Sequence, residues 1–445
     1  MSRVARIGLT GGLAVVVFVA GGIGLFRGLT DVPSTSAPVQ APSTAVLLRP
    51  LAGAGSLEDA IANLQQRLRV VPADWKGFAS LGLEYIAEAR VSADPTFYPK
   101  AEGVLHQSLQ INSQDNFEAF VGLGALALAR HDFAGALTDG RRAVAMNPYD
   151  ADVYGVIGDG QIELGHYRQA FATFQTMVDT RPDLSSYARV SYARELQGDV
   201  PGAIVAMQAA EDAAGTPSDA AWASFQLGEL YWNSGRVDKA AQAYRRGTEL
   251  APEYVPPLAG LAKVAWGNGD IGRATSLFTQ VVERYPSPEY VIALGDLYAV
   301  QGDQGQADQE YALVRAEHDL FAANGVNIDL ELALFDADHG AAPDALAAAR
   351  AEWARRQSIH VADALGWALY ANGRYAPAAR YADKALALGT RNASFMFHAG
   401  MIQLRLGNDA RARELLSEAL ATNPNFSILY AQAAKDTLAK LEGPA

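Results

Sequence analysis

The sequence predicts an all-α fold, an α-solenoid of about ten helical hairpins that follows an amino-terminal transmembrane anchor or signal segment. Three observations predict it. The chain has 445 residues, more than a single hydrophobic core usually organises. Alanine is abundant and β-branched runs are scarce, which favours helix. Small and apolar residues recur with a period of about 34 residues, and such periods are typical of stacked repeats.

The first element is an apolar amino-terminal segment within residues 1–26. Ile7 to Phe26 carry no charge, Arg3 and Arg6 precede them, and Arg27 follows. This length is enough to cross a bilayer as a helix. Six glycines make the stretch only modestly hydrophobic, so a cleavable signal peptide remains the alternative to an uncleaved anchor. Both interpretations keep the basic end in the cytoplasm and place the rest of the chain outside.

The next element, residues 27–55, is expected to be a tether. It contains Pro33, Pro38, Pro42 and Pro50 among Ser, Thr, Ala and Gly, without helical periodicity. A repeat array is expected over residues 56–426, opened by a single helix around Ala60. Residues 427–445 are expected to form a carboxyl-terminal capping helix and tail.

Ten copies of one pattern can be placed in the array, and each predicts two antiparallel helices. The first helix of each copy carries a small residue that lets the two backbones approach: Gly82, Gly124, Gly158, Ser191, Gly228, Ala262, Gly295, Ala333, Gly366 and Gly400. The second helix carries an alanine with the reciprocal role: Ala101, Ala136, Ala170, Ala203, Ala240, Ala274, Ala307, Ala345, Ala378 and Ala412. Prolines such as Pro148, Pro182 and Pro252 close copies because proline cannot extend a helix.

This pattern resembles the tetratricopeptide repeat, a unit of about 34 residues that reads W-x2-L-G-x2-Y, then A-x3-F, then P. The resemblance covers residues 56–441, and the whole chain is similar to exported bacterial proteins with many such repeats. It implies a superhelix with an extended concave surface for partners. The copy around Ala333 departs most from the pattern. Long joins near residues 213–220 and 318–327 are interpreted either as flexible seams or as long turns.

Composition and motifs exclude several function classes. The net charge is -13, which argues against a nucleic-acid partner because phosphate binding needs clustered Lys and Arg. The chain has no cysteine, and its seven histidines are scattered without a metal-binding spacing. No nucleophile, base and oxyanion set can be assembled from the sequence. We therefore predict no enzyme activity, no catalytic residues, no cofactor and no metal, and the oligomeric state stays open.

The resemblance implies which first-helix positions face the concave surface. The acids at these positions are Glu118, Asp152, Asp159, Glu163, Glu195, Glu229, Glu289, Asp296, Asp338 and Asp363, against only Lys76, Lys263 and Arg405. Aromatic residues also fall there. The predicted partner-binding groove consists of Tyr192, Glu195, Trp222, Phe225, Glu229, Trp232, Lys263, Trp266, Asp296, Asp363, Trp367 and Tyr370.

An acidic groove with an aromatic floor suits an extended protein or peptide segment that is neutral or basic. The expected function is a non-catalytic binding or assembly scaffold, anchored in the cell membrane through residues 7–26 or secreted after cleavage. A polysaccharide-binding or enzyme-associated envelope subunit is the alternative. A third hypothesis is a purely structural role that needs only the outer faces of the solenoid. The alternative interpretation of the groove is that some of its aromatics fill the inner curve and that its acids follow the overall negative charge. Trp232 and Trp266 should lie about 10 Å apart, the separation of packed helices, with Glu229 facing Lys263.

The predicted topology can be tested with reporters fused to the carboxyl terminus. Because Arg3 and Arg6 should hold the amino terminus in the cytoplasm, we expect a reporter that is active only in the cytoplasm to be inactive there. A reporter that needs export should be active at the same position. The opposite pair of results would reverse the topology.

Overall fold

The computed structural model describes residues 57–92 and 94–442, and all regular secondary structure in these ranges is helical. The predicted anchor and tether, residues 1–55, lie outside the described residues. Among the described residues, no helix is both long and apolar enough to span a membrane.

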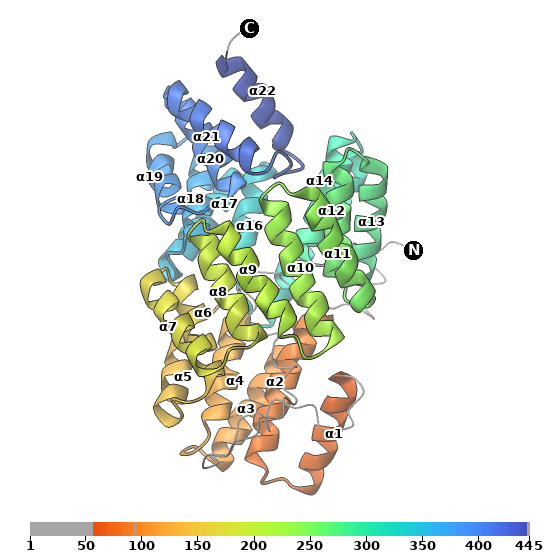
Figure 1. Cartoon of the computed structure of the whole chain (residues 1–445), viewed down its shortest axis with the longest axis vertical. Helices are drawn as coiled ribbons and strands as arrows, with labels where there is room; N and C mark the ends of the chain where they lie inside the picture. The colour runs from red at the N-terminus through yellow and green to blue at the C-terminus, as the bar shows by residue number, and fades with distance from the viewer. Residues whose placement is uncertain (1–56, 93, 443–445) are drawn as a thin grey trace.

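The described part of the chain folds into 22 helices (Figure 1). They are α1 (Leu57–Val70), α2 (Trp75–Ser92), α3 (Phe97–Ile111), α4 (Phe117–Ala129), α5 (Phe133–Met146), α6 (Ala151–Glu163), α7 (Tyr167–Thr180), α8 (Leu184–Leu196), α9 (Val200–Asp212), α10 (Pro217–Asn233), α11 (Val237–Leu250), α12 (Pro256–Gly267), α13 (Ile271–Arg284), α14 (Pro288–Val300), α15 (Gln304–Ala323), α16 (Asp329–Asp338), α17 (Ala342–Arg355), α18 (Ile359–Ala371), α19 (Tyr375–Ala385), α20 (Ala393–Arg405), α21 (Asp409–Thr422) and α22 (Ala431–Glu442).

The helices from α2 to α21 form ten consecutive hairpins, and α1 and α22 flank them. Each predicted small residue lies in the first helix of a hairpin, and each predicted alanine lies in the second. All ten of these alanines are completely buried. The predicted all-α solenoid and its ten copies are therefore confirmed over the described residues.

In several hairpins a large side chain in the second helix requires the small residue of the first. At Gly158, a Cβ atom would lie 2.2 Å from the Phe174 ring, and at Gly228 it would lie 2.3 Å from the Tyr244 ring. Phe174 and Tyr244 are almost completely buried, so neither ring has room to move away. The spacing of sixteen residues between the glycine and the ring thus sets how closely the two helices pack.

The two long joins differ in the structure. Residues 213–216 alone connect α9 to α10, so the first join is a short turn. The second join is helical through Ala323, because α15 extends well beyond the usual repeat length before a short connection leads to α16. The segment at 318–323 is therefore part of a helix and not a loop.

The solenoid winds so tightly that its second turn lies directly on its first. The Asn327 backbone N–H donates to the Arg130 carbonyl oxygen at 3.2 Å. The Ile359 N–H donates to the Tyr167 hydroxyl at 2.6 Å, across 192 residues of sequence. In Figure 1, α17 to α19 accordingly lie above α6 and α7. One superhelical turn therefore takes between five and six repeats, each of about 34 residues.

A buried ion group joins the two turns at this place. The Arg356 guanidinium, whose side chain is 1% exposed, donates to Glu163 at the end of α6 and to Glu352 in α17. It also stands over the Phe133 ring, with 4.7 Å between the guanidinium carbon and the ring centroid. Arginine and both carboxylates lose their hydration here, so each depends on the others for compensation.

A second contact between the turns explains an unusual backbone. The hairpin turns commonly place glycine in the left-handed region, but His131 occupies it with φ 63°. Its imidazole Nδ1 bonds to the Asn327 carbonyl oxygen of the next turn. Burial, together with the positive charge of Arg356, lowers the pKa of His131 to about 3. The neutral ring with its proton on Nδ1 is therefore the donor.

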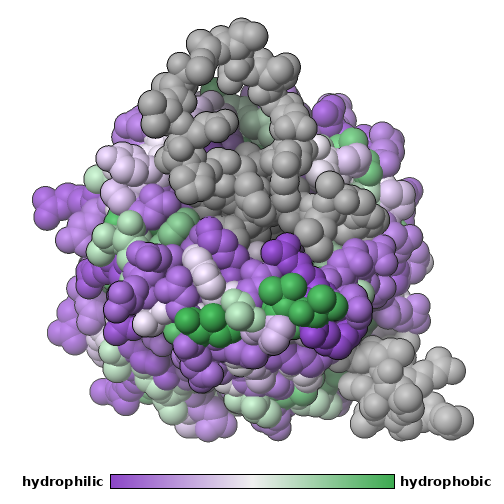
Figure 2. All heavy atoms as spheres, turned by 90° about the horizontal axis from the view of Figure 1, so that it is seen from below, coloured by the Kyte–Doolittle hydropathy of each residue, from purple (hydrophilic) through white to green (hydrophobic). Residues whose placement is uncertain are grey.

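The outer surface at the α1 end is largely hydrophilic. Where this face is open to view, Figure 2 shows mostly hydrophilic residues with scattered apolar areas. Apolar side chains scattered in this way are normal on protein surfaces and need no partner.

We expect Arg356→Met to lower the free energy of unfolding by about 3 to 5 kcal/mol, because it leaves Glu163 buried without its counter-ion and Glu352 with Arg355 alone. Thermal and urea unfolding monitored by circular dichroism would measure this. The matched control is Arg350→Met, at an exposed arginine of α17, which should change stability by less than about 0.5 kcal/mol.

A triple variant, Arg356→Met with Glu163→Leu and Glu352→Leu, should recover most of the loss, because apolar side chains of similar volume can replace a buried ion group. If Arg356→Met alone unfolds like the wild type, the ion group does not hold the two turns together.

Candidate functional site in the concave surface

The structure buries or half-buries all twelve side chains of the predicted groove. Tyr192, Phe225, Glu229, Trp232, Asp296, Asp363 and Trp367 are buried, and Glu195, Trp222, Lys263, Trp266 and Tyr370 are half-buried. The tight winding is the reason, since the inner faces of the first helices contact one another. The aromatics thus pack into the inner curve, and the open floor that the sequence suggested is reduced to a smaller space.

One pocket on the inner side of the solenoid has a volume of about 330 Å³. It contains five residues of the predicted groove: Trp232, Lys263, Trp266, Asp296 and Asp363. The other seven do not line it. Its walls come from α10, α12, α13, α14, α16, α18, α20 and the connection between α21 and α22.

One wall of the pocket carries the two tryptophans and an ion pair whose charged atoms are already bonded within the protein. The ring centroids of Trp232 and Trp266 are 6.3 Å apart, closer than the helix separation predicted, because the side chains lean toward each other. Lys263 Nζ donates to both Glu229 carboxylate oxygens at 2.6 and 2.7 Å, as the sequence suggested. The Tyr244 hydroxyl also donates to Glu229 at 2.6 Å. The lysine is therefore already neutralised by the chain itself.

The opposite wall contains two aspartate–histidine pairs. Asp296 accepts from His339 Nε2 and from the Tyr311 hydroxyl, each at 2.9 Å. Asp363 accepts from His398 Nδ1 at 2.9 Å. Burial alone would lower the pKa of both histidines, but the neighbouring aspartates outweigh it and raise the pKa of each. Both pairs are thus saturated by partners within the protein.

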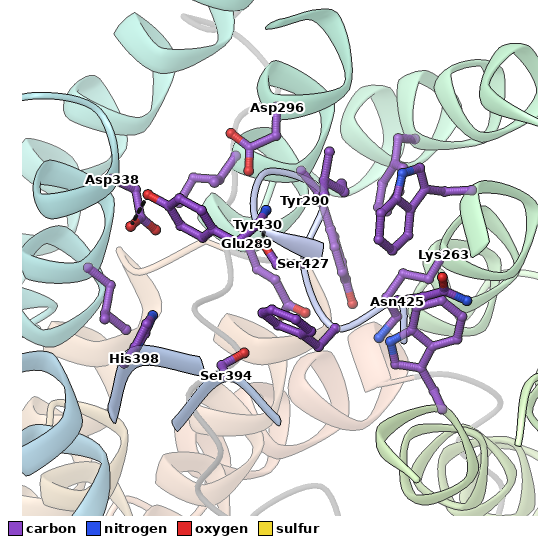
Figure 3. Close-up of a pocket in the computed structure, with 18 of the residues that line it drawn as sticks. Lys263, Glu289, Tyr290, Asp296, Asp338, Ser394, His398, Asn425, Ser427 and Tyr430 are labelled. Atoms are coloured by element: carbon purple, nitrogen blue, oxygen red, sulfur yellow. Dashed lines mark hydrogen bonds between the residues drawn. The ribbon is translucent and has the colours of Figure 1, made fainter. Parts of the chain in front are cut away.

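Asp338 lies between these pairs without a basic partner in ion-pair contact among the described residues. Its Oδ1 accepts from Trp367 Nε1 at 2.6 Å. It also accepts from the Tyr430 hydroxyl at 2.9 Å (Figure 3). Burial raises the pKa of Asp338, and the hydrogen bond from Trp367 and the positive charge of His398 oppose the rise. Two neutral donors therefore hold this carboxyl group in place at the pocket wall.

Glu289 has an exposed side chain in the pocket. Enclosing protein atoms raise its pKa to about 7, Lys263 works against the rise, and Glu229 adds to it. Next to it, Tyr290 is 2% exposed, and its hydroxyl has no hydrogen-bond partner among the described residues. These two neighbours at the start of α14 are the pocket's least satisfied polar groups.

The connection between α21 and α22 forms the last wall, and sequence reasoning missed it. Asn425 Nδ2 donates to the Gly267 carbonyl oxygen at 3.3 Å, across 158 residues of sequence. Ile428 packs against the core of α12 to α14, and Tyr430 stacks with Phe397, with ring centroids 5.1 Å apart. The alternating apolar residues Phe426, Ile428 and Tyr430 were the available signal, because a solvent-exposed turn does not need them.

The same reasoning also missed Tyr290 and His398. Both lie at positions that the repeat pattern assigns to packing, so their place at the pocket could not be read from the period. Among residues 57–92 and 94–442, no three His, Asp or Glu side chains converge on a site that could hold a metal ion.

Parts of the chain match known repeat proteins. A tetratricopeptide repeat family model matches residues 197–255, 260–319 and 364–425. Cellulose synthase 1 operon protein C of Komagataeibacter xylinus is 26% identical over 248 residues, which is 55% of this chain. The chain spans only 16% of the length of that relative.

Two solved structures illustrate the similarity. A tetratricopeptide repeat protein from Parabacteroides merdae aligns at 16% identity with TM-score 0.35, covering 58% of this chain and 98% of that one. A protein of the same kind from Thermus thermophilus aligns at 24% identity with TM-score 0.36, covering 42% and 98%. With ten hairpins of the expected pattern and three segments matched by the family model, the chain is a tetratricopeptide repeat protein.

Proposed function

We propose that this chain is a non-catalytic scaffold that binds a partner protein through the concave pocket, on the extracytoplasmic side of the membrane. Tetratricopeptide repeat proteins generally act as scaffolds for protein interaction. The supporting observation is the pocket itself, where Glu289 and Asp338 have no basic partner in ion-pair contact among the described residues, beside two tryptophans. A neutral or basic segment of a partner fits this combination of acid and aromatic groups.

The pocket is small for a long peptide, so we infer that it takes one anchoring side chain. Binding sites in proteins for drug-sized ligands have volumes of roughly 300 to 1,000 Å³, and this one is at the lower end. The remaining recognition would then come from the rims, where Trp266 and Lys263 are half-buried. A single buried anchor surrounded by weaker contacts is the usual distribution of binding energy in interfaces.

A second candidate is a subunit of an envelope complex that handles a polysaccharide. The match to a cellulose synthase operon protein favours it, and aromatic walls also bind sugars. The two candidates differ in charge. A neutral sugar would leave Glu289 and Asp338 uncompensated, and its binding would not depend on salt, whereas binding of a basic protein segment would weaken as salt rises.

Partner capture from an envelope extract tests the proposal. We expect the full chain to retain a partner protein at low salt and to lose it as ionic strength rises, and Glu289→Gln with Asp338→Asn to retain much less. A cellulose-pelleting assay with the same proteins covers the alternative. Pelleting that is insensitive to salt, with no protein captured, would reject the scaffold proposal.

The tryptophan pair separates packing from binding. Trp232 is 5% exposed, so Trp232→Ser should lower the free energy of unfolding by about 3 to 5 kcal/mol through lost burial. Trp266 is half-buried at the rim, so Trp266→Ser should cost clearly less while reducing partner capture. Urea unfolding and capture on the two variants would measure both effects. Equal stability losses would show that Trp266 is also a core residue.

A further inference from the structure

The pocket contains more carboxyl groups than basic partners. Lys263 is paired with Glu229, His339 with Asp296, and His398 with Asp363. No Lys, Arg or His of the described residues forms an ion pair with Glu289 or Asp338. A ligand that brings one positive charge would therefore compensate one of these two carboxylates, and an anionic ligand would add a third uncompensated negative charge.

A hydroxyl beside this charge also lacks a partner. Tyr290 is 2% exposed and its oxygen makes no hydrogen bond with the described residues. The Glu289 carboxylate is the charge that contributes most to raising the pKa of this phenol. In Figure 3 the Tyr290 hydroxyl end lies on the same side of the pocket as the Glu289 side chain. A buried polar group without a partner costs about 1 to 3 kcal/mol, so an N–H donor arriving at this place would recover that loss.

Aromatic side chains line the same pocket. Trp232 and Trp266 come from α10 and α12, and Phe426 and Tyr430 come from the connection before α22. Aromatic faces attract a nearby cation, and they stack best on one that is planar. The pocket thus offers a carboxylate, an unpaired phenol oxygen and aromatic walls to one small group.

We propose that the pocket binds the guanidinium of an arginine side chain of the partner, paired with Glu289 and donating to the Tyr290 hydroxyl. This deepens the proposed function and rests on it. Guanidinium is planar and carries five N–H donors, so one group can serve the carboxylate and the phenol together while stacking on an indole. An ammonium has three donors around a point charge and stacks less well. The Asp338 carboxyl group adds negative potential from the facing wall.

The inference is tested with three short peptides that differ in one side chain. Acetyl-Gly-Arg-Gly-amide, its citrulline analogue and its lysine analogue are titrated into the full chain, with tryptophan fluorescence and calorimetry as readouts. We expect the arginine peptide to bind at least about tenfold more tightly than the citrulline peptide, which keeps the shape and loses the charge. Equal affinities, or no binding of the arginine peptide, would overturn the inference.

Variants assign the binding to the named groups. Glu289→Gln should weaken the arginine peptide about tenfold, whereas Glu283→Gln, an exposed glutamate at the end of α13, should change nothing. Tyr290→Phe should weaken it severalfold without lowering the melting temperature, because the hydroxyl has no partner to lose. Unchanged affinity in Glu289→Gln would contradict the assignment.

The pH profile gives a readout that a structural role would not. The pKa of Glu289 is about 7, so the carboxylate is mostly protonated at pH 6 and mostly ionised at pH 8. Affinity for the arginine peptide should therefore rise about tenfold over that range and stay flat in Glu289→Gln. The other titratable groups at this pocket are the same in both proteins: Lys263, Asp296, Asp338, Asp363, His398, Tyr290 and Tyr430 in its lining, with Glu229 and His339 bonded to them.

The two proposals fail differently. If the full chain captures a partner protein and does not distinguish arginine from citrulline, the guanidinium site is wrong and the scaffold stands. If the arginine peptide binds through Glu289 and no protein is captured, the site stands and the scaffold proposal fails.

Discussion

Contact between the two turns of the solenoid is the constraint on which the rest of the structure depends. The hairpins alone do not determine how steeply the superhelix rises. Arg356 is buried between Glu163 of the first turn and Glu352 of the second, and only contact between the turns adds the Glu163 carboxylate to its local partner Glu352. His131 and Asn327 form a second contact of the same kind. These groups therefore fix the pitch, and the pitch closes the inner surface.

Closure changes the chemistry of the acids inside. Burial is the largest cause that raises the pKa to about 7 at five inner carboxyls: Asp152, Glu163, Glu195, Glu289 and Glu331. Because these values exceed the unfolded ones, the stability they contribute is complete below about pH 4 and is lost as pH rises toward 7. Burial lowers the pKa of His131 to about 3 and of His360 to about 4. Their contribution to stability has the opposite pH dependence and decreases as the pH falls. These five carboxyl groups therefore contribute more stability in a mildly acidic medium than at neutral pH.

The sequence predicts the hairpins well because each has a local signature. Gly158 faces Phe174 and Gly228 faces Tyr244 at the same spacing, so a period of about 34 residues is enough to place every pair. The contacts between turns join residues 192 to 196 apart, and no period reports which side chains meet over that distance. For this reason the period places the twelve groove positions in first helices, but it does not report the burial of Trp232 and Trp367.

The pocket lies where the chain completes a turn, and this couples binding to the pitch. A Cβ atom at Gly235 would lie 2.8 Å from the Thr422 carbonyl oxygen, so the end of α21 rests on the turn after α10. Asn425 reaches Gly267 and Tyr430 reaches Asp338 across the pocket. A ligand held between Glu289 and these residues contacts both turns at once. Its binding energy adds to that of the contacts that hold the turns together. By the same linkage, any change that weakens the Arg356 contacts between the turns should lower the affinity for the ligand.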